Sequence, residues 1–151
     1  MPRAAIALGS NLGDRQANLE AAILRIGALG DVVRVSSFVD TEPVGYLDQP
    51  RFLNAMLLLE TKIPPLDLLR ALLGMELGMG RIRSGIPAKG PRTVDLDLIL
   101  YGDVVLETPE LTLPHPAMHQ RGFVLGPLAE IAPEWRHPVL ERTVAELLTE
   151  L

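Results

Sequence analysis

Two aspartates, Asp95 and Asp97, are the residues whose spacing most clearly indicates chemistry. They lie in the segment 93–101, where apolar residues alternate with them as expected for a β-strand, so both carboxylates face one side with Cα atoms about 6–7 Å apart. The apolar residues face the other side: Val94, Leu96, Leu98 and Leu100. Two carboxylates this close repel each other unless a cation lies between them. Because magnesium binds one or two carboxylates together with substrate phosphates, the pair predicts a phosphate-anchored magnesium site.

A basic segment precedes the aspartate pair. Residues 77–94 contain no Asp or Glu and hold four cations: Arg81, Arg83, Lys89 and Arg92. Because a guanidinium donates two parallel hydrogen bonds to a phosphate, arginines beside metal-binding carboxylates are typical of phosphoryl transfer. Taken singly, each feature has a simpler alternative, which is a solvated loop for the arginines and an exposed sheet face for the aspartates.

Three further groups of polar residues are candidates. His115 and His119 have the spacing of metal ligands on a helix, but the absence of a third His or Cys nearby disfavours zinc, and His115 could instead donate a hydrogen bond to a phosphate. The segment 9–13, Gly-Ser-Asn-Leu-Gly, resembles a small phosphate loop without the Walker lysine, and a tight strand-to-helix turn explains it as well. Asn54 lies in an apolar strand, where a buried amide needs a hydrogen-bond partner. That partner is either a nearby backbone group or the edge of a bound heterocycle.

The elements that position these residues follow from periodicity, capping and turn residues. Helices are predicted at 14–29, 64–78 and 123–131, with a short helix opening at Pro116 and a last helix begun by a Thr143–Glu146 capping box. Strands are predicted at 4–8, 32–38, 52–60, 93–101 and, after a Gly102-Asp103 turn, 104–106. Irregular loops are expected at 40–51 and 79–91. This order predicts an α+β fold, a ferredoxin-like α/β sandwich whose mostly antiparallel sheet carries helices on its faces.

Composition limits the class of protein. A chain of 151 residues, 48% apolar and 22% charged, is expected to form a single domain over residues 1–151 and is not of a disordered type. Its net charge of −5 argues against a nucleic-acid binder. The sequence has no cysteine, and its first residues resemble neither a signal peptide nor a membrane span, so we expect a cytoplasmic protein with no membrane partner.

Together these segments resemble the 6-hydroxymethyl-7,8-dihydropterin pyrophosphokinase family of folate biosynthesis. The similar segments run almost end to end: 6–13, 35–38, 41–45, 48–55, 76–83, 90–97, 113–116 and 121–123. The most specific of them is Gly-Pro-Arg-x-x-Asp-x-Asp, which ends at Asp97.

The resemblance implies an activity and a set of site residues. The family transfers the diphosphate of ATP to the hydroxymethyl group of the pterin and releases AMP, and it suggests a monomer that uses two magnesium ions. It assigns the ions to Asp95 and Asp97, and the transferred diphosphate to Arg81 and Arg92. The implied nucleotide-binding residues are Glu76, Arg83, His115 and Arg121. The implied pterin-binding residues are Thr41, Val44, Gly45, Phe52, Asn54 and Phe123, with Phe123 stacking on the ring.

Two other functions stay open on the residues alone. Another magnesium-dependent phosphotransferase or nucleotidyltransferase on the same fold would also use the carboxylate pair, but it would not need Asn54 and Phe123 as a heterocycle pocket. A non-catalytic ligand-binding domain would not need the carboxylate pair at all. Substitution of Asn54 therefore separates the first alternative from the implied activity, and substitution of Asp97 separates the second.

Overall fold

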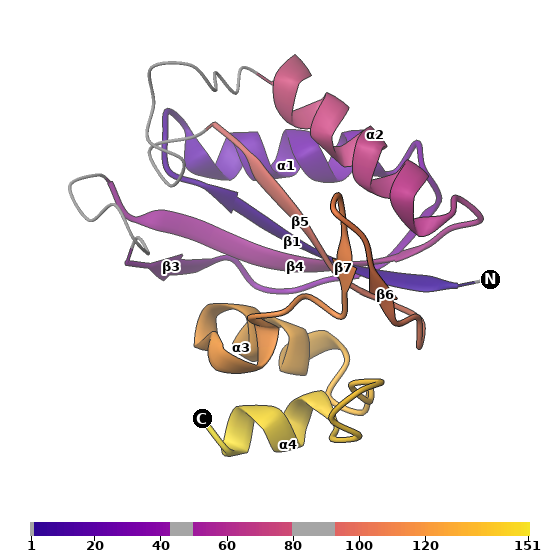
Figure 1. Ribbon diagram of the computed structural model, residues 1–151. Helices are drawn as coiled ribbons and strands as arrows, with labels where there is room; N and C mark the ends of the chain where they lie inside the picture. The colour runs from indigo at the N-terminus through magenta and orange to yellow at the C-terminus, as the bar shows by residue number, and fades with distance from the viewer. Residues whose placement is uncertain (1, 43–49, 80–92) are drawn as a thin grey trace.

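A five-stranded antiparallel sheet forms the centre of the computed structural model, which describes residues 2–42, 50–79 and 93–151. Its strands are β1 (Arg3–Ser10), β2 (Asp31–Val35), β3 (Val39–Thr41), β4 (Phe52–Glu60) and β5 (Asp95–Tyr101). The strand order is β2-β4-β1-β5, and β3 pairs with the part of β4 that β2 leaves open (Figure 1). Since β1 and β2 are both antiparallel to β4, they run parallel to each other in a split β-α-β unit.

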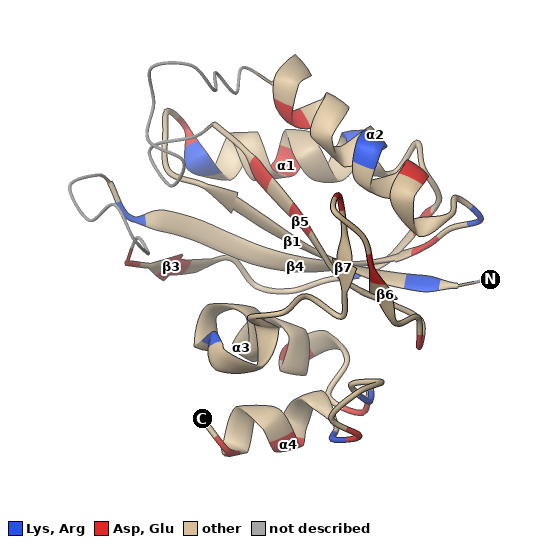
Figure 2. Cartoon of the chain, viewed as in Figure 1, with Lys and Arg blue, Asp and Glu red and all other residues tan. Residues whose placement is uncertain are grey.

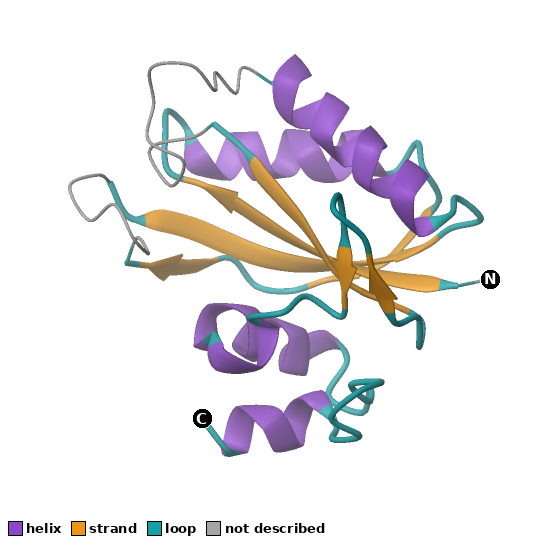
Figure 3. Ribbon diagram, viewed as in Figure 1, coloured by secondary structure: helices purple, strands orange, loops and turns teal. Residues whose placement is uncertain are grey.

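Helices cover both faces of this sheet. One face carries α1 (Arg15–Ile26) and α2 (Pro65–Gly78), and the other carries α3 (Gly122–Ile131) and α4 (Val144–Thr149) (Figures 1 and 3). Between β5 and α3 the chain forms a ribbon of β6 (Leu106–Glu107) with β7 (Thr112–Leu113), and a 3-10 turn, η1 (Met118–Gln120). The predicted ferredoxin-like α+β sandwich is thus confirmed. Among the described segments, no helix combines the length and apolarity needed to span a membrane.

The central strands alternate between two cores. On β4, Leu57 and Leu59 pack toward α1 and α2, whereas Met56 and Leu58 pack toward α3 and α4. The same alternation sends Leu96 and Leu98 of β5 into the first core. Asp95 and Asp97 are left on the α3 side, as the period of a strand requires.

Leu100 departs from this alternation, and the prediction that it shares a face with Leu96 and Leu98 is wrong. It packs in the α3/α4 core because the register between β1 and β5 shifts by one residue: Leu98 pairs with Ile6, but Leu100 pairs with Ala5. The extra residue forms a β-bulge, which reverses the alternation beyond it. The bulge follows Asp97, so it leaves the two carboxylates on a common face.

Three other predicted elements need correction. The strand predicted at 32–38 ends at Val35, because Ser36 Oγ replaces a backbone carbonyl as acceptor for the N–H of Met56 at 2.8 Å. The strand β3 then occupies the start of the loop predicted at 40–51. The segment 104–106 does not return along β5. Its Leu106 pairs with Leu113 of β7 instead. The short helix predicted from Pro116 begins only at Met118, as η1.

The capping box at the start of α4 is confirmed. Thr143 Oγ1 accepts a hydrogen bond from the N–H of Glu146 at 3.1 Å, and Glu146 Oε1 accepts one from the N–H of Thr143 at 2.9 Å. Thr143→Ala removes the first acceptor, so we expect the free energy of unfolding in urea to fall by about 1 kcal/mol.

A second threonine of α4 provides the matched control. Thr149 Oγ1 donates to the carbonyl of Ala145 near the end of the helix and caps no free N–H group. Thr149→Ala should therefore change the free energy of unfolding by less than about 0.5 kcal/mol. Equal effects of the two substitutions would contradict the capping role of Thr143.

Candidate active site

Three strands and the start of α3 bring the candidate residues together on the α3 side of the sheet. β1 lies between β4 and β5, so its Gly9 is opposite both Asn54 and Asp95, and its Ala7 is opposite Asp97. The N-cap residue Arg121 and the first turn of α3 line the cavity opposite the strands. The cavity is lined by Ala7, Leu8, Gly9, Asn54, Ala55, Asp95, Asp97, Arg121, Phe123 and Val124.

The carboxylates of Asp95 and Asp97 are half-buried and line this one cavity, as the alternation predicts; Figure 2 shows acidic residues on the β5 ribbon. Within residues 2–42, 50–79 and 93–151, no three His, Cys, Asp or Glu side chains lie close enough together to hold a metal ion. The donor set therefore fits a cation that accepts two protein carboxylates and takes phosphate oxygens and water for its other ligands. Magnesium binds in this way.

Glu76 of α2 holds the strand that carries the two aspartates. Its side chain is only 1% exposed, and its Oε2 accepts a hydrogen bond from the N–H of Leu96 at 2.7 Å. Leu96 stands between Asp95 and Asp97, so this bond fixes the backbone from which both carboxylates project. The nucleotide-binding role implied for Glu76 by the family resemblance stays a prediction beside this observed contact.

Asn54 of β4 is joined to Thr41 of β3 at the opposite side of the cavity. The Asn54 Nδ2 donates a hydrogen bond to Thr41 Oγ1, so the amide has a side-chain partner on the neighbouring strand. A Cβ atom on Gly9 would lie 3.0 Å from Asn54 Oδ1 and 3.4 Å from the Phe52 ring. Asn54 and Phe52 therefore occupy the space beside Gly9 that a side chain there would need.

Gly9 is thus a residue of the candidate site that the sequence analysis placed only in a turn or a phosphate loop. The sequence patterns end the strand at residue 8, whereas β1 runs to Ser10, so only the structure shows Gly9 as a glycine inside a strand, where it marks the close approach of another group. The turn itself is explained locally: Gly13 has a φ of +68°, Asp14 caps α1, and Asn18 Nδ2 donates to Ser10 Oγ and to the carbonyl of Leu12. These contacts favour the strand-to-helix turn over the phosphate loop.

His115 reaches the same site from the segment that follows β7. Its backbone N–H donates to the carbonyl of Ile99, and its Nδ1 accepts from the N–H of Ala117 at 3.2 Å. Burial lowers the pKa of His115, the positive charge of Arg121 lowers it further, and Asp95 opposes both. A neutral ring whose Nδ1 accepts carries its proton on Nε2, so His115 retains one N–H donor for a phosphate oxygen.

Arg121 and Phe123 come from the start of α3. The Arg121 guanidinium lies 5.6 Å from the centroid of the Phe123 ring, within cation–π range. Both side chains line the cavity that contains Asp95 and Asp97. The structure therefore brings the predicted nucleotide residues His115 and Arg121 close to the predicted pterin residue Phe123.

A cluster of charged residues that the sequence analysis did not identify lies beside Thr41 and Phe52. Arg15 donates to both carboxylate oxygens of Asp40, at 3.2 and 3.1 Å, and to the carbonyl of Arg51 at 3.0 Å. Arg51 Nε completes the cluster with a 3.1 Å bond to Asp40, and the two guanidiniums, Arg15 first, lower the pKa of Asp40. The cluster ties β3 to the start of β4. The cluster could not be predicted from local sequence patterns, because its members are 11 to 36 positions apart.

Five predicted site residues lie outside the described residues: Val44, Gly45, Arg81, Arg83 and Arg92. Their roles remain as the family resemblance implies them. The other nine predicted residues are described. Five of them line the cavity: Asn54, Asp95, Asp97, Arg121 and Phe123. Thr41 bonds to Asn54, Phe52 lies beside Gly9, and His115 lies near Arg121 and Asp95, whereas Glu76 contacts the β5 backbone from α2.

Protein stability should depend on pH through two histidines, the buried His137 and the partly buried His115. Burial lowers the pKa of His115, and it also lowers the pKa of His137, whose Nδ1 accepts the N–H groups of Val139 and Leu140. The folded state then binds fewer protons than the unfolded state, in which histidine has a pKa of about 6.5. The stabilisation is fully present above that pH and is lost as the pH falls through the folded-state pKa.

Urea unfolding at pH 7.5 and pH 5.5 checks this expectation. We expect a lower free energy of unfolding at pH 5.5, and His137→Gln should remove part of the difference between the two pH values. Equal stability at both pH values, or greater stability at pH 5.5, would contradict the lowered pKa values.

Comparison with known proteins places this fold and site in a family. The family model described as 7,8-dihydro-6-hydroxymethylpterin-pyrophosphokinase (HPPK) matches residues 5–133. The 2-amino-4-hydroxy-6-hydroxymethyldihydropteridine pyrophosphokinase of Pseudomonas aeruginosa is 44% identical over 138 residues, covering 90% of this chain and 84% of that protein. The protein of the same name from Bacillus subtilis is 46% identical over 128 residues, covering 83% of this chain and 75% of that protein.

Other relatives are longer than this chain. The folic acid synthesis protein fol1 of Schizosaccharomyces pombe is 40% identical over 148 residues, which are 97% of this chain but 20% of that protein. A crystal structure of Plasmodium falciparum HPPK-DHPS with pteroate superimposes with a TM-score of 0.78 at 16% identity, covering 99% of this chain and 42% of that one. The chain therefore spans a fifth to under half of these proteins, and the structural likeness supports the fold alone.

The antiparallel sheet and its helical cover place the chain in the α+β class, and the carboxylate pair on β5 is of the kind that metal-dependent phosphate-transferring enzymes use. Within that class, the chain belongs to the 7,8-dihydro-6-hydroxymethylpterin-pyrophosphokinase family. The predicted family is confirmed, and with it the predicted activity, that of an ATP-using pyrophosphokinase of folate biosynthesis.

Proposed function

We propose that residues 1–151 form one domain that transfers the β,γ-diphosphate of ATP to the hydroxymethyl group of 6-hydroxymethyl-7,8-dihydropterin. The observation that supports this most strongly is the meeting of two kinds of group in one cavity. Asp95 and Asp97 line it from β5, Asn54 lines it from β4, and Phe123 lines it from the start of α3. A phosphotransferase for a substrate without a heterocycle would need only the first pair, and a ligand-binding domain would need only the second.

The chemistry is a displacement at phosphorus. The hydroxymethyl oxygen of the pterin attacks the β-phosphorus of ATP and forms the new O–P bond. The bond from the β-phosphorus to the oxygen that bridges the α- and β-phosphates breaks, and AMP leaves with that oxygen. The hydroxyl proton passes to solvent. Such a transfer needs little covalent work from the protein, so positioning and charge neutralisation supply the rate.

Asp95 and Asp97 would hold two magnesium ions. When bound, the ions neutralise charge on the ATP phosphates. The positive charge of Arg121 and the Nε2–H of His115 lie on the same side of the sheet as the carboxylates and are suited to phosphate oxygens. Arg81 and Arg92 are assigned to the transferred diphosphate, and Arg83 and Glu76 to the nucleotide.

Asn54 and Thr41 would orient the pterin through its hydrogen-bonding edge, with Val44, Gly45 and Phe52 around it. Phe123 would stack on the ring, since aromatic faces bind planar heterocycles with an offset parallel geometry. We also propose that the protein acts as a cytoplasmic monomer whose partners are ATP and the pterin. The lack of cysteine suits a reducing compartment, and the net charge of −5 gives no support to a nucleic-acid partner.

Product analysis tests the proposed reaction. The purified protein is mixed with ATP, magnesium and 6-hydroxymethyl-7,8-dihydropterin, and the nucleotides are separated by anion-exchange chromatography. We expect AMP and pterin diphosphate in equal amounts, and neither product when magnesium is removed by chelation. ADP in place of AMP would indicate attack at the γ-phosphorus, and the absence of any product from the folded protein would favour a non-catalytic ligand-binding domain.

A further inference from the structure

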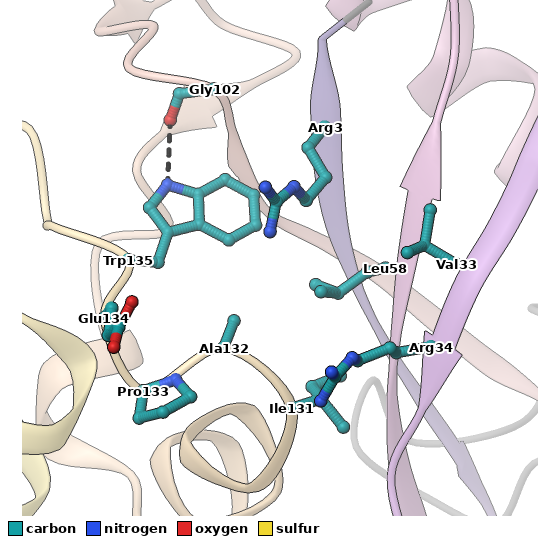
Figure 4. Close-up of a pocket in the computed structure, with 10 residues that line it drawn as sticks. All are labelled: Arg3, Val33, Arg34, Leu58, Gly102, Ile131, Ala132, Pro133, Glu134 and Trp135. Atoms are coloured by element: carbon teal, nitrogen blue, oxygen red, sulfur yellow. Dashed lines mark hydrogen bonds between the residues drawn. The ribbon is translucent and has the colours of Figure 1, made fainter.

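A second cavity lies on the α3/α4 face at the far end of β1 from the candidate active site. Its volume is about 690 Å³, within the range of small-molecule sites. It is lined by Arg3, Val33, Arg34, Leu58, Gly102, Ile131, Ala132, Pro133, Glu134 and Trp135 (Figure 4). Arg3 and Gly9 are six residues apart on β1, a distance of about 20 Å, so this cavity is separate from the carboxylate pair.

The floor of this cavity is apolar. Leu58, Ile131 and Ala132 are buried members of the α3/α4 core, and their side chains form the base on which a ligand would rest. Trp135 forms one wall, and its indole Nε1–H donates to the carbonyl of Gly102 at 3.1 Å. Because the N–H group is already satisfied, the indole presents its hydrocarbon surface to the cavity (Figure 4). A fixed indole beside an aliphatic floor favours a planar, aromatic ligand.

Two guanidinium groups give the cavity its charge. Arg3 enters from β1, with its guanidinium 5.7 Å from the centroid of the Trp135 ring, and Arg34 enters from β2 on the other side of Leu58 (Figure 4). Among the residues that the structure describes, neither guanidinium forms an ion pair. Glu134 is the one acid among the lining residues, so the lining has two positive charges and one negative charge, a net charge of +1.

We propose that this cavity binds a small planar aromatic anion, of the carboxylate or sulfonate class. The aromatic ring would rest on Leu58 and Ile131 against Trp135, and the anionic group would lie between Arg3 and Arg34. A guanidinium donates paired hydrogen bonds to such planar or tripodal oxygens, which supplies the polar half of the recognition. The site is independent of the catalytic residues and goes beyond the proposed function.

The single tryptophan of the chain allows a direct test with naphthalene-2-sulfonate as the probe. Because Trp135 is the only tryptophan, one indole N–H resonance in a ¹⁵N–¹H spectrum of the full chain reports on this cavity. We expect a saturable shift of that resonance, an affinity that falls with added salt, and a roughly tenfold weaker affinity for the uncharged analogue naphthalene-2-sulfonamide.

Substitutions distinguish specific binding of the probe in this cavity from nonspecific attraction of the probe to positive charge on the protein surface. Arg34→Gln and Arg3→Gln should each weaken probe binding about tenfold, because each removes a charged hydrogen-bond donor. Arg25→Gln is the matched control, since Arg25 is an exposed arginine of α1 on the opposite face, and its substitution should change the affinity less than twofold. None of the three variants should alter AMP formation.

Three results would overturn the proposal. The first is no saturable shift of the indole resonance at millimolar probe. The second is unchanged affinity in both Arg3→Gln and Arg34→Gln. The third is displacement of the probe by ATP with magnesium in direct competition, which would place the probe in the catalytic site instead.

Discussion

Asp97→Asn is expected to lower kcat/KM for diphosphate transfer by a factor of at least about 10³. The substitution keeps the shape of the side chain but removes one of the two carboxylates that line the cavity beside Gly9. Loss of one magnesium-binding carboxylate leaves charge on the transferring phosphates without a counterion, and a penalty of about 4 kcal/mol in the transition state corresponds to that factor. Initial rates of AMP formation at saturating magnesium measure it.

A nearby aspartate supplies the control for this substitution. Asp103 is exposed in the turn that follows β5, outside the candidate cavity. Asp103→Asn carries the same charge change and should retain wild-type activity. Asp97→Asn with nearly full activity, and with a circular dichroism spectrum and urea midpoint like those of the wild type, would contradict the catalytic role of the carboxylate pair.

Asn54→Ala is expected to raise the KM for the dihydropterin by about 10- to 100-fold while changing the KM for ATP by less than about twofold. A site built to hydrogen-bond a polar edge loses about 1.5–3 kcal/mol when that group is removed, which corresponds to this range. Asn54 lies across the cavity from Asp95, so the substitution should weaken binding of the heterocycle and leave binding of the ATP phosphates unchanged. Steady-state kinetics with each substrate varied in turn provides the measurement.

Asn18→Ala is the companion variant, because Asn18 makes its hydrogen bonds within the turn before α1 and does not line the cavity. It should leave the KM for the pterin unchanged. An unchanged pterin KM in Asn54→Ala would instead favour a phosphotransferase that has no heterocycle pocket.

The two carboxylates could be placed on one face from the sequence because the evidence needed is local. Side chains alternate with a period of two, and nothing interrupts β5 between Asp95 and Asp97. The same rule failed at Leu100, because the bulge depends on how β5 pairs with β1, almost one hundred positions earlier in the chain. Local periodicity carries no information on such a register shift.

The capping box of α4 was predictable for the same reason, since Thr143 and Glu146 are three residues apart. The contacts that hold the site together join residues far apart in the sequence. The Glu76 bond to Leu96 spans 20 positions, and the bond from Ser37 to Glu130, which ties the β2–β3 connection to α3, spans 93. Single residues of these types are common on protein surfaces, so only the folded chain reveals their partners.

The roles of His115, Arg121 and Phe123 came from family resemblance and not from physical chemistry. A lone histidine or phenylalanine in a sequence is most often part of a turn or a core. The fold supplies the missing argument by bringing the start of α3 and the segment after β7 to the face that carries Asp95. Sequence patterns assign Gly9 to a turn. The need for a glycine at this position is explained only by the structure, in which Asn54 and Phe52 lie beside it.

The number of metal ions held at Asp95 and Asp97 is the most direct measure of how this site works. Manganese replaces magnesium in the experiment, and electron paramagnetic resonance counts the ions bound per chain in the presence of a non-hydrolysable ATP analogue. We expect two ions in the wild-type protein, two in Asp103→Asn and fewer than two in Asp97→Asn. Two ions bound with unchanged affinity in Asp97→Asn would show that the carboxylate pair on β5 is not the metal centre.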